Sequence, residues 1–217
     1  MSERCVRPEP IAAEDLTPGE RIVTIGTFDG VHRGHRALIA EAIAEARRMG
    51  RPAHMLTFEP TPREVIFPDN PPPRLTSFRE RWRAIEDSGL DALCVLPFTP
   101  ALRGYTGPQF LALLGGDLQV GGVVVGHDFR FGSGAESSGP QLHAGAAAHG
   151  FTVSIMEPIR VDGERVSSTA IREALARHKL GLAARLLGRP YSMRGRVVVG
   201  QRLGRTLGFP TANLRLE

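Results

Sequence analysis

The chain has 217 residues, 41% of them hydrophobic and 23% charged, which is long enough to bury a core and ordinary for a globular protein. The formal net charge is +4 and the arginines are scattered, so the composition argues against a nucleic-acid partner and suits an anionic small molecule. No apolar stretch has the length of a signal-peptide core or a membrane span, so we expect a cytoplasmic protein without a membrane partner.

Five β-rich stretches alternate with helix-like stretches in the first part of the chain. The predicted strands are residues 21–25, 53–58, 92–98, 120–126 and 151–156. Apolar residues recur at helical spacing after the first strand until Gly50, and further helices are predicted over 77–89, 107–115, 140–150, from 168 and over 179–187. This order of strands and helices predicts an α/β protein with a parallel sheet and helices on both faces.

The alternation ends near Leu187. The following residues are punctuated by glycine and proline and indicate turns and extended chain, which predicts the start of a β-rich second domain. About thirty residues are too few for an independent core, so we expect a truncated domain or a remnant of one. The predicted organisation is therefore an N-terminal extension (1–18), an α/β domain (19–186) and a C-terminal segment (187–217).

The stretch "TIGTFDGVHRGHRALI" is unusually rich in glycine and histidine for one loop. Its composition is compatible with a metal site, a phosphate site or an ordinary turn. It lies between a predicted strand and a predicted helix, where ligands bind in open parallel sheets and where the helix N-terminus attracts anions. Gly26, Gly30 and Gly34 let the backbone approach a ligand. His32 and His35 can donate hydrogen bonds to phosphate oxygens, so we favour a phosphate site.

A zinc site at this loop is the weaker alternative. An HxxH pair needs at least a third protein ligand, and the other five histidines are dispersed singly. Cys5 and Cys94 are far apart and show no CxxC spacing, so we expect Cys94 to be a buried apolar residue. Asp29 suits a metal or a ribose hydroxyl better than phosphate, because an ionised carboxylate only accepts hydrogen bonds. A structural turn with incidental histidines also stays open.

The stretch "VSSTAIREAL" predicts a second helix start that can face an anion. Ser168 or Thr169 lies at the beginning of this helix, where a hydroxyl residue is normally only a cap. Arg172 lies one turn inside the helix and shares a face with Ser168, so hydroxyl and guanidinium can converge on one anion.

These stretches resemble the motifs of one known family. "GTFDGVHRGH" resembles the HxGH signature of the nucleotidyltransferase superfamily, and its Phe-Asp-Gly-Val version is similar to the adenylyltransferase module of bacterial bifunctional riboflavin kinase/FAD synthetases. "LTFEPTPREVIF", "VGHDFRFG" and "SSTAIR" resemble further motifs of that module, in the same order. Residues 188–214 resemble the start of the riboflavin kinase module, including its GRxxGFPTAN signature. The resemblance implies a Rossmann-like nucleotidyltransferase domain followed by the start of a β-barrel domain.

The resemblance also implies an activity, its substrates and its site residues. The implied enzyme is an FMN adenylyltransferase, which forms FAD and pyrophosphate from FMN and ATP with Mg²⁺ and without a covalent enzyme intermediate. His32 and His35 are implied to stabilise the triphosphate, and Ser168, Thr169 and Arg172 to clamp the far phosphates. Nucleotide contacts are implied for Gly26, Thr27, Phe28, Asp29 and Gly34. Flavin or phosphate contacts are implied for Phe58, Pro60, Gly126, Asp128 and Arg130, and Mg²⁺ and ATP contacts in the kinase module for Thr211 and Asn213.

Two features depart from this family. Thr61 stands where the family usually has histidine. The kinase base and most of its flavin pocket are expected beyond Glu217, so the resemblance implies an incomplete kinase module, which puts kinase activity of this chain in doubt. Two rival functions stay open: a related HxGH nucleotidyltransferase with another acceptor, and a flavin-nucleotide-binding protein whose catalysis has decayed. The sequence shows no oligomer interface, and it leaves open whether Glu217 is a natural end.

Overall fold

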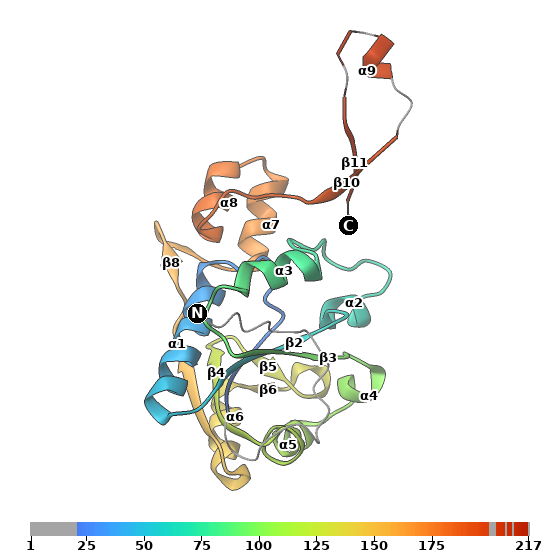
Figure 1. The fold of residues 1–217 in the computed structure, drawn as a ribbon. Helices are drawn as coiled ribbons and strands as arrows, with labels where there is room; N and C mark the ends of the chain where they lie inside the picture. The colour runs from blue at the N-terminus through green and yellow to red at the C-terminus, as the bar shows by residue number, and fades with distance from the viewer. Residues whose placement is uncertain (1–20, 200–202, 207, 210, 217) are drawn as a thin grey trace.

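A parallel five-stranded sheet forms the centre of the protein (Figure 1). The computed structural model describes residues 21–199, 203–206, 208–209 and 211–216, so the predicted N-terminal extension lies outside the described residues. The strands are β1 (Arg21–Ile25), β2 (Ala53–Phe58), β3 (Ala92–Leu96), β4 (Val120–Gly126) and β7 (Thr152–Met156). Their order is β3-β2-β1-β4-β7 and every neighbouring pair is parallel, so the five predicted strands and the α/β fold class are confirmed.

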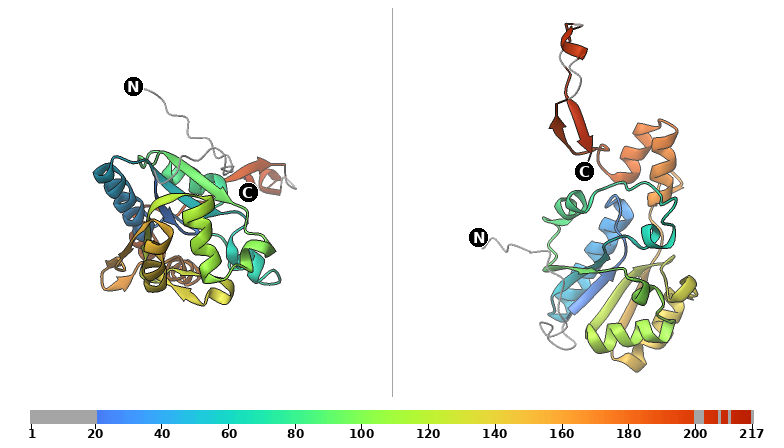
Figure 2. Two further views of the ribbon diagram at one scale, coloured as in Figure 1. Left: turned by 90° about the horizontal axis from the view of Figure 1, so that it is seen from below. Right: turned by 90° about the vertical axis from the view of Figure 1, so that its right-hand side faces the viewer.

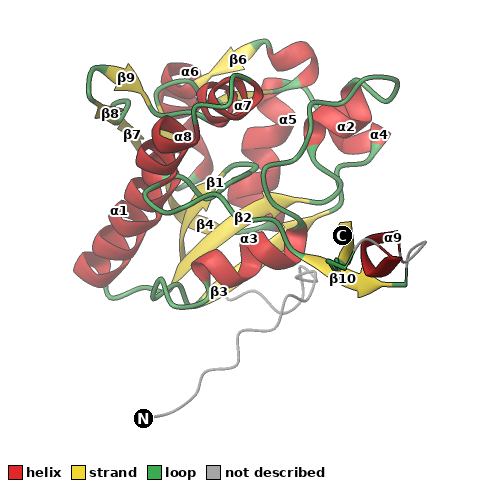
Figure 3. Ribbon diagram, turned by 90° about the horizontal axis from the view of Figure 1, so that it is seen from above, coloured by secondary structure: helices red, strands yellow, loops and turns green. Residues whose placement is uncertain are grey.

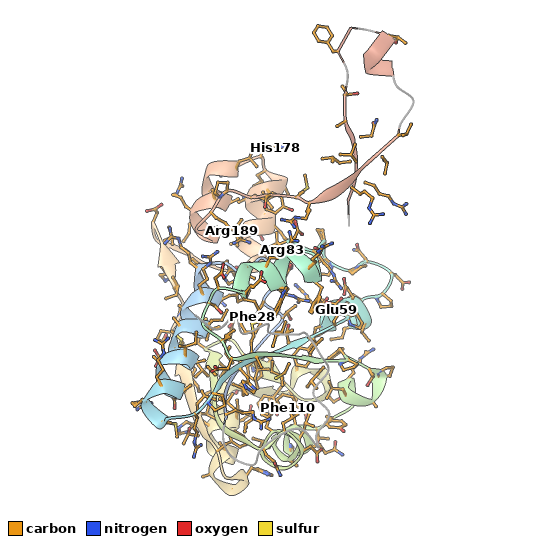
Figure 4. All side chains as sticks on the ribbon, in the orientation of Figure 1. Phe28, Glu59, Arg83, Phe110, His178 and Arg189 are labelled. Carbon is orange, nitrogen blue, oxygen red and sulfur yellow. The ribbon has the colours of Figure 1, made fainter. Side chains whose placement is uncertain are left out.

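Helices cover both faces of this sheet, as predicted. The main helices are α1 (Arg33–Met49), α3 (Phe78–Ile85), α5 (Gly107–Ala112) and α6 (Gly139–Ala146). Successive residues of a strand point to opposite faces, so Ile22 belongs to a core with residues of α1 and α3, and Val23 to a core with residues of α5 and α6. Figure 3 shows α3 and α5 on opposite sides of the strands, and Figure 4 labels Phe28 and Phe110 on these two sides.

The strand order reverses at β1, and this reversal positions the site. From β1 the chain passes through α1 to β2 on one side, whereas β4 lies on the other side of β1. The connections that follow β1 and β4 therefore diverge at the carboxyl edge of the sheet, where such folds bind ligands. Gly26 follows β1 directly and Gly126 ends β4, so both glycines lie at this edge.

A third apolar core lies beyond the carboxyl edge. It is formed by α7 (Ser168–Ala176) and α8 (Leu180–Leu187), together with Leu75 and Val166 from preceding loops. Leu186 and Leu187 are both buried in this core. The chain leaves α8 through Gly188, whose φ of 78° lies in the left-handed region that favours glycine.

Several short elements either were not predicted or, in the case of η2 and η4, form the ends of predicted helices in another helical form. They are α2 (Pro62–Ile66), α4 (Pro100–Arg103), the π turn η2 (Leu113–Asp117) that continues α5, the turns η3 (Ser133–Ala135) and η4 (Ala147–His149), and the two-residue pairs β5–β6 (Arg130–Phe131, Ser137–Ser138) and β8–β9 (Arg160–Val161, Glu164–Arg165). The C-terminal segment forms the antiparallel pair β10 (Gly195–Val198) and β11 (Asn213–Leu216), with α9 (Leu203–Thr206) between them. Figure 2 shows this hairpin projecting from the body near α8.

Candidate active site

A cleft of about 450 Å³ lies at the carboxyl ends of β1 and β4, a size typical of sites for small organic ligands. Its walls come from the loops after β1, β2 and β4 and from the segment between β7 and α7. The cleft brings together most of the predicted site residues: Gly26, Thr27, Phe28, Asp29, His32, Gly34, His35, Phe58, Gly126, Asp128, Arg130, Ser168, Thr169 and Arg172. Pro60 does not line it, and the exposed Thr211 and Asn213 lie on the C-terminal segment, away from its walls.

The first turns of α1 and α7 both line this cleft. His32 caps α1, and Ser167 caps α7 by accepting a hydrogen bond from the Ala170 N–H at 3.1 Å, so Ser168 is the first helical residue. A cap of this kind satisfies one amide of the first turn, and the amides before it keep no acceptor within the helix. Two helix N-termini at one cleft favour an anion there.

The loop between β1 and α1 has a constrained backbone. Gly30 has a φ of 86°, and the non-glycine residues Phe28 and Val31 have φ values of 54° and 39°. A bulky residue in this region costs of order 1–3 kcal/mol and persists where its surroundings impose it. Both side chains are buried, at 1% and 0% exposure, so tertiary packing supplies that constraint.

Hydrogen bonds from distant residues direct the carbonyl oxygens of this loop toward the interior of the protein. The Thr27 carbonyl accepts from the Arg81 guanidinium at 2.6 Å, and the Asp29 carbonyl accepts from the Ser168 hydroxyl at 2.8 Å. The carbonyls of Gly30 and Val31 accept from the Arg189 guanidinium, and that of Val31 also accepts from Arg36 Nε at 3.4 Å. Carbonyl oxygens repel anions, so their removal from the cleft leaves a loop surface suited to phosphate.

The Asp29 side chain holds this loop from the other side. Its carboxylate accepts from the backbone N–H groups of Leu75 and Thr76 at 2.9 and 3.0 Å, and from the Arg172 guanidinium at 2.9 Å. The side chain is buried with only 8% of its surface exposed. Both carboxylate oxygens of Asp29 thus have protein partners, and a contact of Asp29 with a metal or a ribose stays a prediction.

Arg172 and Ser168 do converge, but on a residue of the protein: both contact Asp29, Arg172 at the carboxylate and Ser168 at the backbone carbonyl. Arg172 donates to the Asp29 carboxylate and to the Pro73 carbonyl, and Ser168 donates to the Asp29 carbonyl. The predicted clamp is therefore built into the scaffold of the loop. Arg172 keeps 18% of its side-chain surface exposed and still lines the cleft.

The two histidines form a stacked pair. Their ring centroids are 3.5 Å apart with an interplanar angle of 15°, and the Phe28 ring packs edge-on against His35 at 5.1 Å. Burial lowers the pKa of His32 to about 4 and the pKa of His35 well below its ordinary value, the second effect being strengthened by neighbouring His32. Both rings are therefore neutral near pH 7 and act as hydrogen-bond donors rather than cations.

The geometry of the pair assigns the proton of His32. Its Nδ1 atom accepts the His35 backbone N–H at 3.2 Å, so the neutral ring carries its proton on Nε2, the atom available to a ligand. Gly34 permits this arrangement, because a Cβ atom at residue 34 would lie 3.3 Å from Cε1 and Nδ1 of the His32 ring. The glycine of the HxGH stretch thus leaves room for the ring of His32.

The other end of the cleft is exposed. An ion pair between Asp128 and Arg165 lies here, with 62% and 42% of the two side chains exposed. Arg63 and Arg130 also line the cleft, are exposed, and form no ion pair within the described part of the chain. These arginines give the mouth a surplus of positive charge toward an anionic ligand.

The wall after β2 carries the predicted flavin residues. Phe58 lines the cleft with little exposed surface, and its ring meets Phe98 edge to face at 5.7 Å. Thr61, where the family usually has histidine, is buried and caps α2; its N–H donates to the Glu64 carboxylate at 2.8 Å. Arg74 bonds the same carboxylate and lowers the pKa of Glu64 to about 2. Thr61 therefore serves the fold of this wall.

Metal-binding side chains are sparse around the cleft. Within residues 21–199 and the described part of the C-terminal segment, no group of three or more histidine, cysteine, aspartate or glutamate side chains could hold a metal ion. Asp29 is engaged by the protein and Asp128 by Arg165. Mg²⁺ commonly binds through one or two carboxylates plus substrate phosphates, so it fits here only with the phosphates as its main ligands. Thr211 and Asn213 are neutral and exposed, and they do not line the cleft.

Some residues that shape the site carry no recognisable signal in the sequence. Arg81 is 2% exposed on α3 and bonds the Thr27 carbonyl and Glu59, although an arginine in an amphipathic helix is normally expected at the surface. Arg189 lies outside every motif of the adenylyltransferase module. A signal did exist for α2, because "TPRE" has the spacing of a capping box with proline at the first helical position.

The open parallel sheet, the cleft at its switch point and the histidine loop at a helix N-terminus define a nucleotidyltransferase-like α/β domain. A sequence model described as FAD synthetase matches residues 15–170, and one described as riboflavin kinase matches residues 187–217. The chain belongs to the FAD synthetase family.

Similar curated proteins are named bifunctional riboflavin kinase/FMN adenylyltransferase. The protein from Escherichia coli K12 is 43% identical over 197 residues, which cover 90% of this chain and 63% of the relative. The protein from Pseudomonas fluorescens is 41% identical, covering 94% and 66%. The chain therefore spans a little under two thirds of the length of these relatives.

A solved structure supports the same fold. The crystal structure of a macrolide-efflux protein from Streptococcus pneumoniae has a TM-score of 0.83 and 32% sequence identity, covering 96% of this chain and 69% of that one. The word efflux belongs to the name of that protein and is not carried over to this chain. Across the residues described here, no helix combines the length and apolar character needed to cross a membrane.

Proposed function

We propose that this chain is an FMN adenylyltransferase that acts on ATP and FMN in the cytoplasm, without a nucleic-acid or membrane partner. The observation that carries the proposal is the histidine loop with its carbonyls turned inward, facing a cleft that is also lined by the first turn of α7. Its relatives are named for the same activity. The segment that matches riboflavin kinase contributes an exposed hairpin, so the proposal concerns adenylyl transfer alone.

In the proposed reaction an oxygen of the FMN phosphate attacks the α-phosphorus of ATP. The bond between that phosphorus and the oxygen bridging to the β-phosphorus breaks, and pyrophosphate leaves with the electron pair. The FMN phosphate is already an anion, so no strong base is needed, and positioning and charge stabilisation account for the rate. Mg²⁺ on the phosphates would neutralise charge on the leaving group.

The residues of the chain have distinct proposed roles. The neutral His32 and His35 donate single hydrogen bonds to triphosphate oxygens, without competing protonation near pH 7. Asp29, Arg172 and Ser168 hold the loop in place from behind. Arg63 and Arg130 attract the anionic substrates to the mouth, and Phe58 offers its ring to the flavin.

The test is FAD synthesis by the purified chain. With FMN, ATP and Mg²⁺ we expect FAD and pyrophosphate in equal amounts, measured by chromatography and a coupled phosphate assay. His35→Ala should lower kcat by about 100-fold or more, whereas His143→Ala, on the exposed side of α6, should leave it unchanged. FMN binding by calorimetry without pyrophosphate release would support a binding protein instead, and turnover with CTP or another acceptor would support a related nucleotidyltransferase.

A further inference from the structure

Arg189 lies at the corner where the chain leaves α8, and its guanidinium reaches back to the histidine loop. Nη1 donates to the Val31 carbonyl at 3.1 Å and Nη2 donates to the Gly30 carbonyl at 2.9 Å. These contacts join residues that are 158 and 159 positions apart in the sequence. Figure 4 labels Arg189 beside α8, above the part of the molecule that holds Phe28.

The guanidinium of Arg189 is bonded to backbone carbonyls and not to a carboxylate of the described residues. Arg189 is half-buried, and among the described residues it forms no ion pair. A partly buried cation is normally paired with a carboxylate, because losing water is costly for a charge. Here Nη1 and Nη2 donate to carbonyls of residues with positive φ, of which Val31 is the strained one; its carbonyl also accepts from Arg36 Nε at 3.4 Å.

The same corner holds the loop on the other side of His32. The Arg33 side chain donates to the Arg185 carbonyl at 2.8 Å and packs over Gly188, where a Cβ atom would lie 3.1 Å from Arg33 Cγ. His32 is therefore fixed between two contacts with the end of α8, one through Gly30 and Val31 and the other through Arg33. Arg189 itself does not line the cleft.

We infer that Arg189 is a positioning residue for His32, so that the segment matching riboflavin kinase supplies part of the adenylyl-transfer site. This inference rests on the proposed function for its kinetic consequence, although the geometry of the histidine pair can be measured without turnover. It also implies that the structural unit of the transferase extends past Leu187, through α8 and the corner after it.

The kinetic test compares Arg189→Ala and Arg189→Lys with Arg185→Ala in the full chain. Arg185 is a matched control, because it is an arginine of α8 whose side chain is exposed and paired with the exposed Asp162. For Arg189→Ala we expect kcat to fall about 10- to 100-fold, with the KM for FMN within about twofold, since a misplaced group costs turnover more than capture. Lysine should restore part of the loss, as should added guanidinium ion in the alanine variant.

The second measurement follows the histidine rings by ¹⁵N NMR. In the unaltered chain the His32 Nδ1 resonance should show its hydrogen bond to the His35 N–H, and Arg189→Ala should shift it while Arg185→Ala does not. If the unaltered chain makes no FAD, the proposed function is wrong, but the NMR measurement still tests whether Arg189 positions His32. Unchanged kcat together with unchanged histidine spectra in Arg189→Ala would overturn the inference. If that variant does not fold, full activity of Arg189→Lys with unshifted histidine resonances would overturn it equally.

Discussion

The two ends of the cleft are held in very different ways. At the buried end, the Asp29 carboxylate and the carbonyls of the histidine loop are bonded to Arg172, Ser168, Arg81 and Arg189, and the histidine rings are desolvated. At the mouth, Asp128 and Arg165 pair in solvent and neighbouring arginines are unpaired among the described residues. The two ends of the cleft therefore have different tasks. The fixed geometry of the buried end stabilises the transition state, whereas the exposed charges at the mouth speed the binding of anionic substrates.

The largest expected effect comes from Asp29→Asn at the buried end. The amide keeps the size of the side chain but removes the charge that faces Arg172, and its NH2 group meets a donor in either orientation: Arg172, or the amides of Leu75 and Thr76. We expect the free energy of unfolding to fall by about 3 kcal/mol. FAD synthesis should be lost with it, and urea denaturation together with the FAD assay measures both.

Asp162→Asn is the matched control for this prediction. Asp162 pairs with Arg185 at 2.9 Å, the same distance as between Asp29 and Arg172, but 66% and 55% of the two side chains are exposed. Exposed pairs contribute about 0.2–1 kcal/mol, so the control should change little. Equal losses in the two variants would contradict the comparison between buried and exposed parts.

The next effect concerns packing under His32. Gly34→Ala places a methyl group 3.3 Å from the ring, so the ring must shift, and we expect kcat to fall about 10-fold with little change in the free energy of unfolding. Gly116→Ala is the control, since a Cβ atom there has nothing within 4 Å. An active Gly34→Ala variant would show that the position of His32 is not critical.

Local sequence signals predict part of this site, and contacts between distant residues supply the rest. The strand, the loop and the helix start are local signals, so the sheet, its switch point and the gathering of the histidines with Ser168 and Arg172 could be predicted from periodicity and motif order. The partner of Arg172 could not be predicted from the sequence. Asp29 could equally have been a carboxylate that binds a ligand, and only the folded structure shows that the loop at Leu75 and Arg172 lie beside it.

Long-range contacts account for most of what was missed. Arg81 and Arg189 lie 54 and 159 residues from the loop carbonyls they bond, and neither has a local pattern that separates it from a surface arginine. Burial of a cation against carbonyls depends on the assembled fold rather than on residue type. The roles proposed for Thr211 and Asn213 likewise stay predictions, since the hairpin that carries them lies outside the cleft.

A gradual effect, spread over more than two pH units, is expected from acid. Burial lowers the pKa of His32 to about 4 in the folded chain, and burial with the nearby Arg21 does the same for His54, against an ordinary value of 6.5. Below pH 6.5 the unfolded chain binds protons that the folded chain does not. The free energy of unfolding should therefore fall as the pH drops from 6.5 to 4, by about 1.4 kcal/mol per pH unit for each fully titrating histidine.

Urea denaturation across this range measures the slope, and the variants His32→Gln and His54→Gln assign it. Each should flatten the pH dependence by removing one titrating group, whatever its effect on stability at pH 7. A flat dependence between pH 6.5 and 4 in the unaltered chain would contradict neutral, desolvated histidines at the buried end.

The smallest effect is expected from Asp128→Asn at the mouth. Because the Asp128–Arg165 pair is exposed, the free energy of unfolding should change by less than about 0.5 kcal/mol. Removing one acid beside Arg63 and Arg130 should raise kcat/KM by about two- to threefold at low salt, through faster capture of anionic substrate. At 1 M salt, where the screening length is about 3 Å, this gain should disappear while the loss in Asp29→Asn persists. A large, salt-independent loss of kcat in Asp128→Asn would instead mean that this carboxylate contacts the substrate, so that part of the exposed mouth takes part in the fixed geometry of the site.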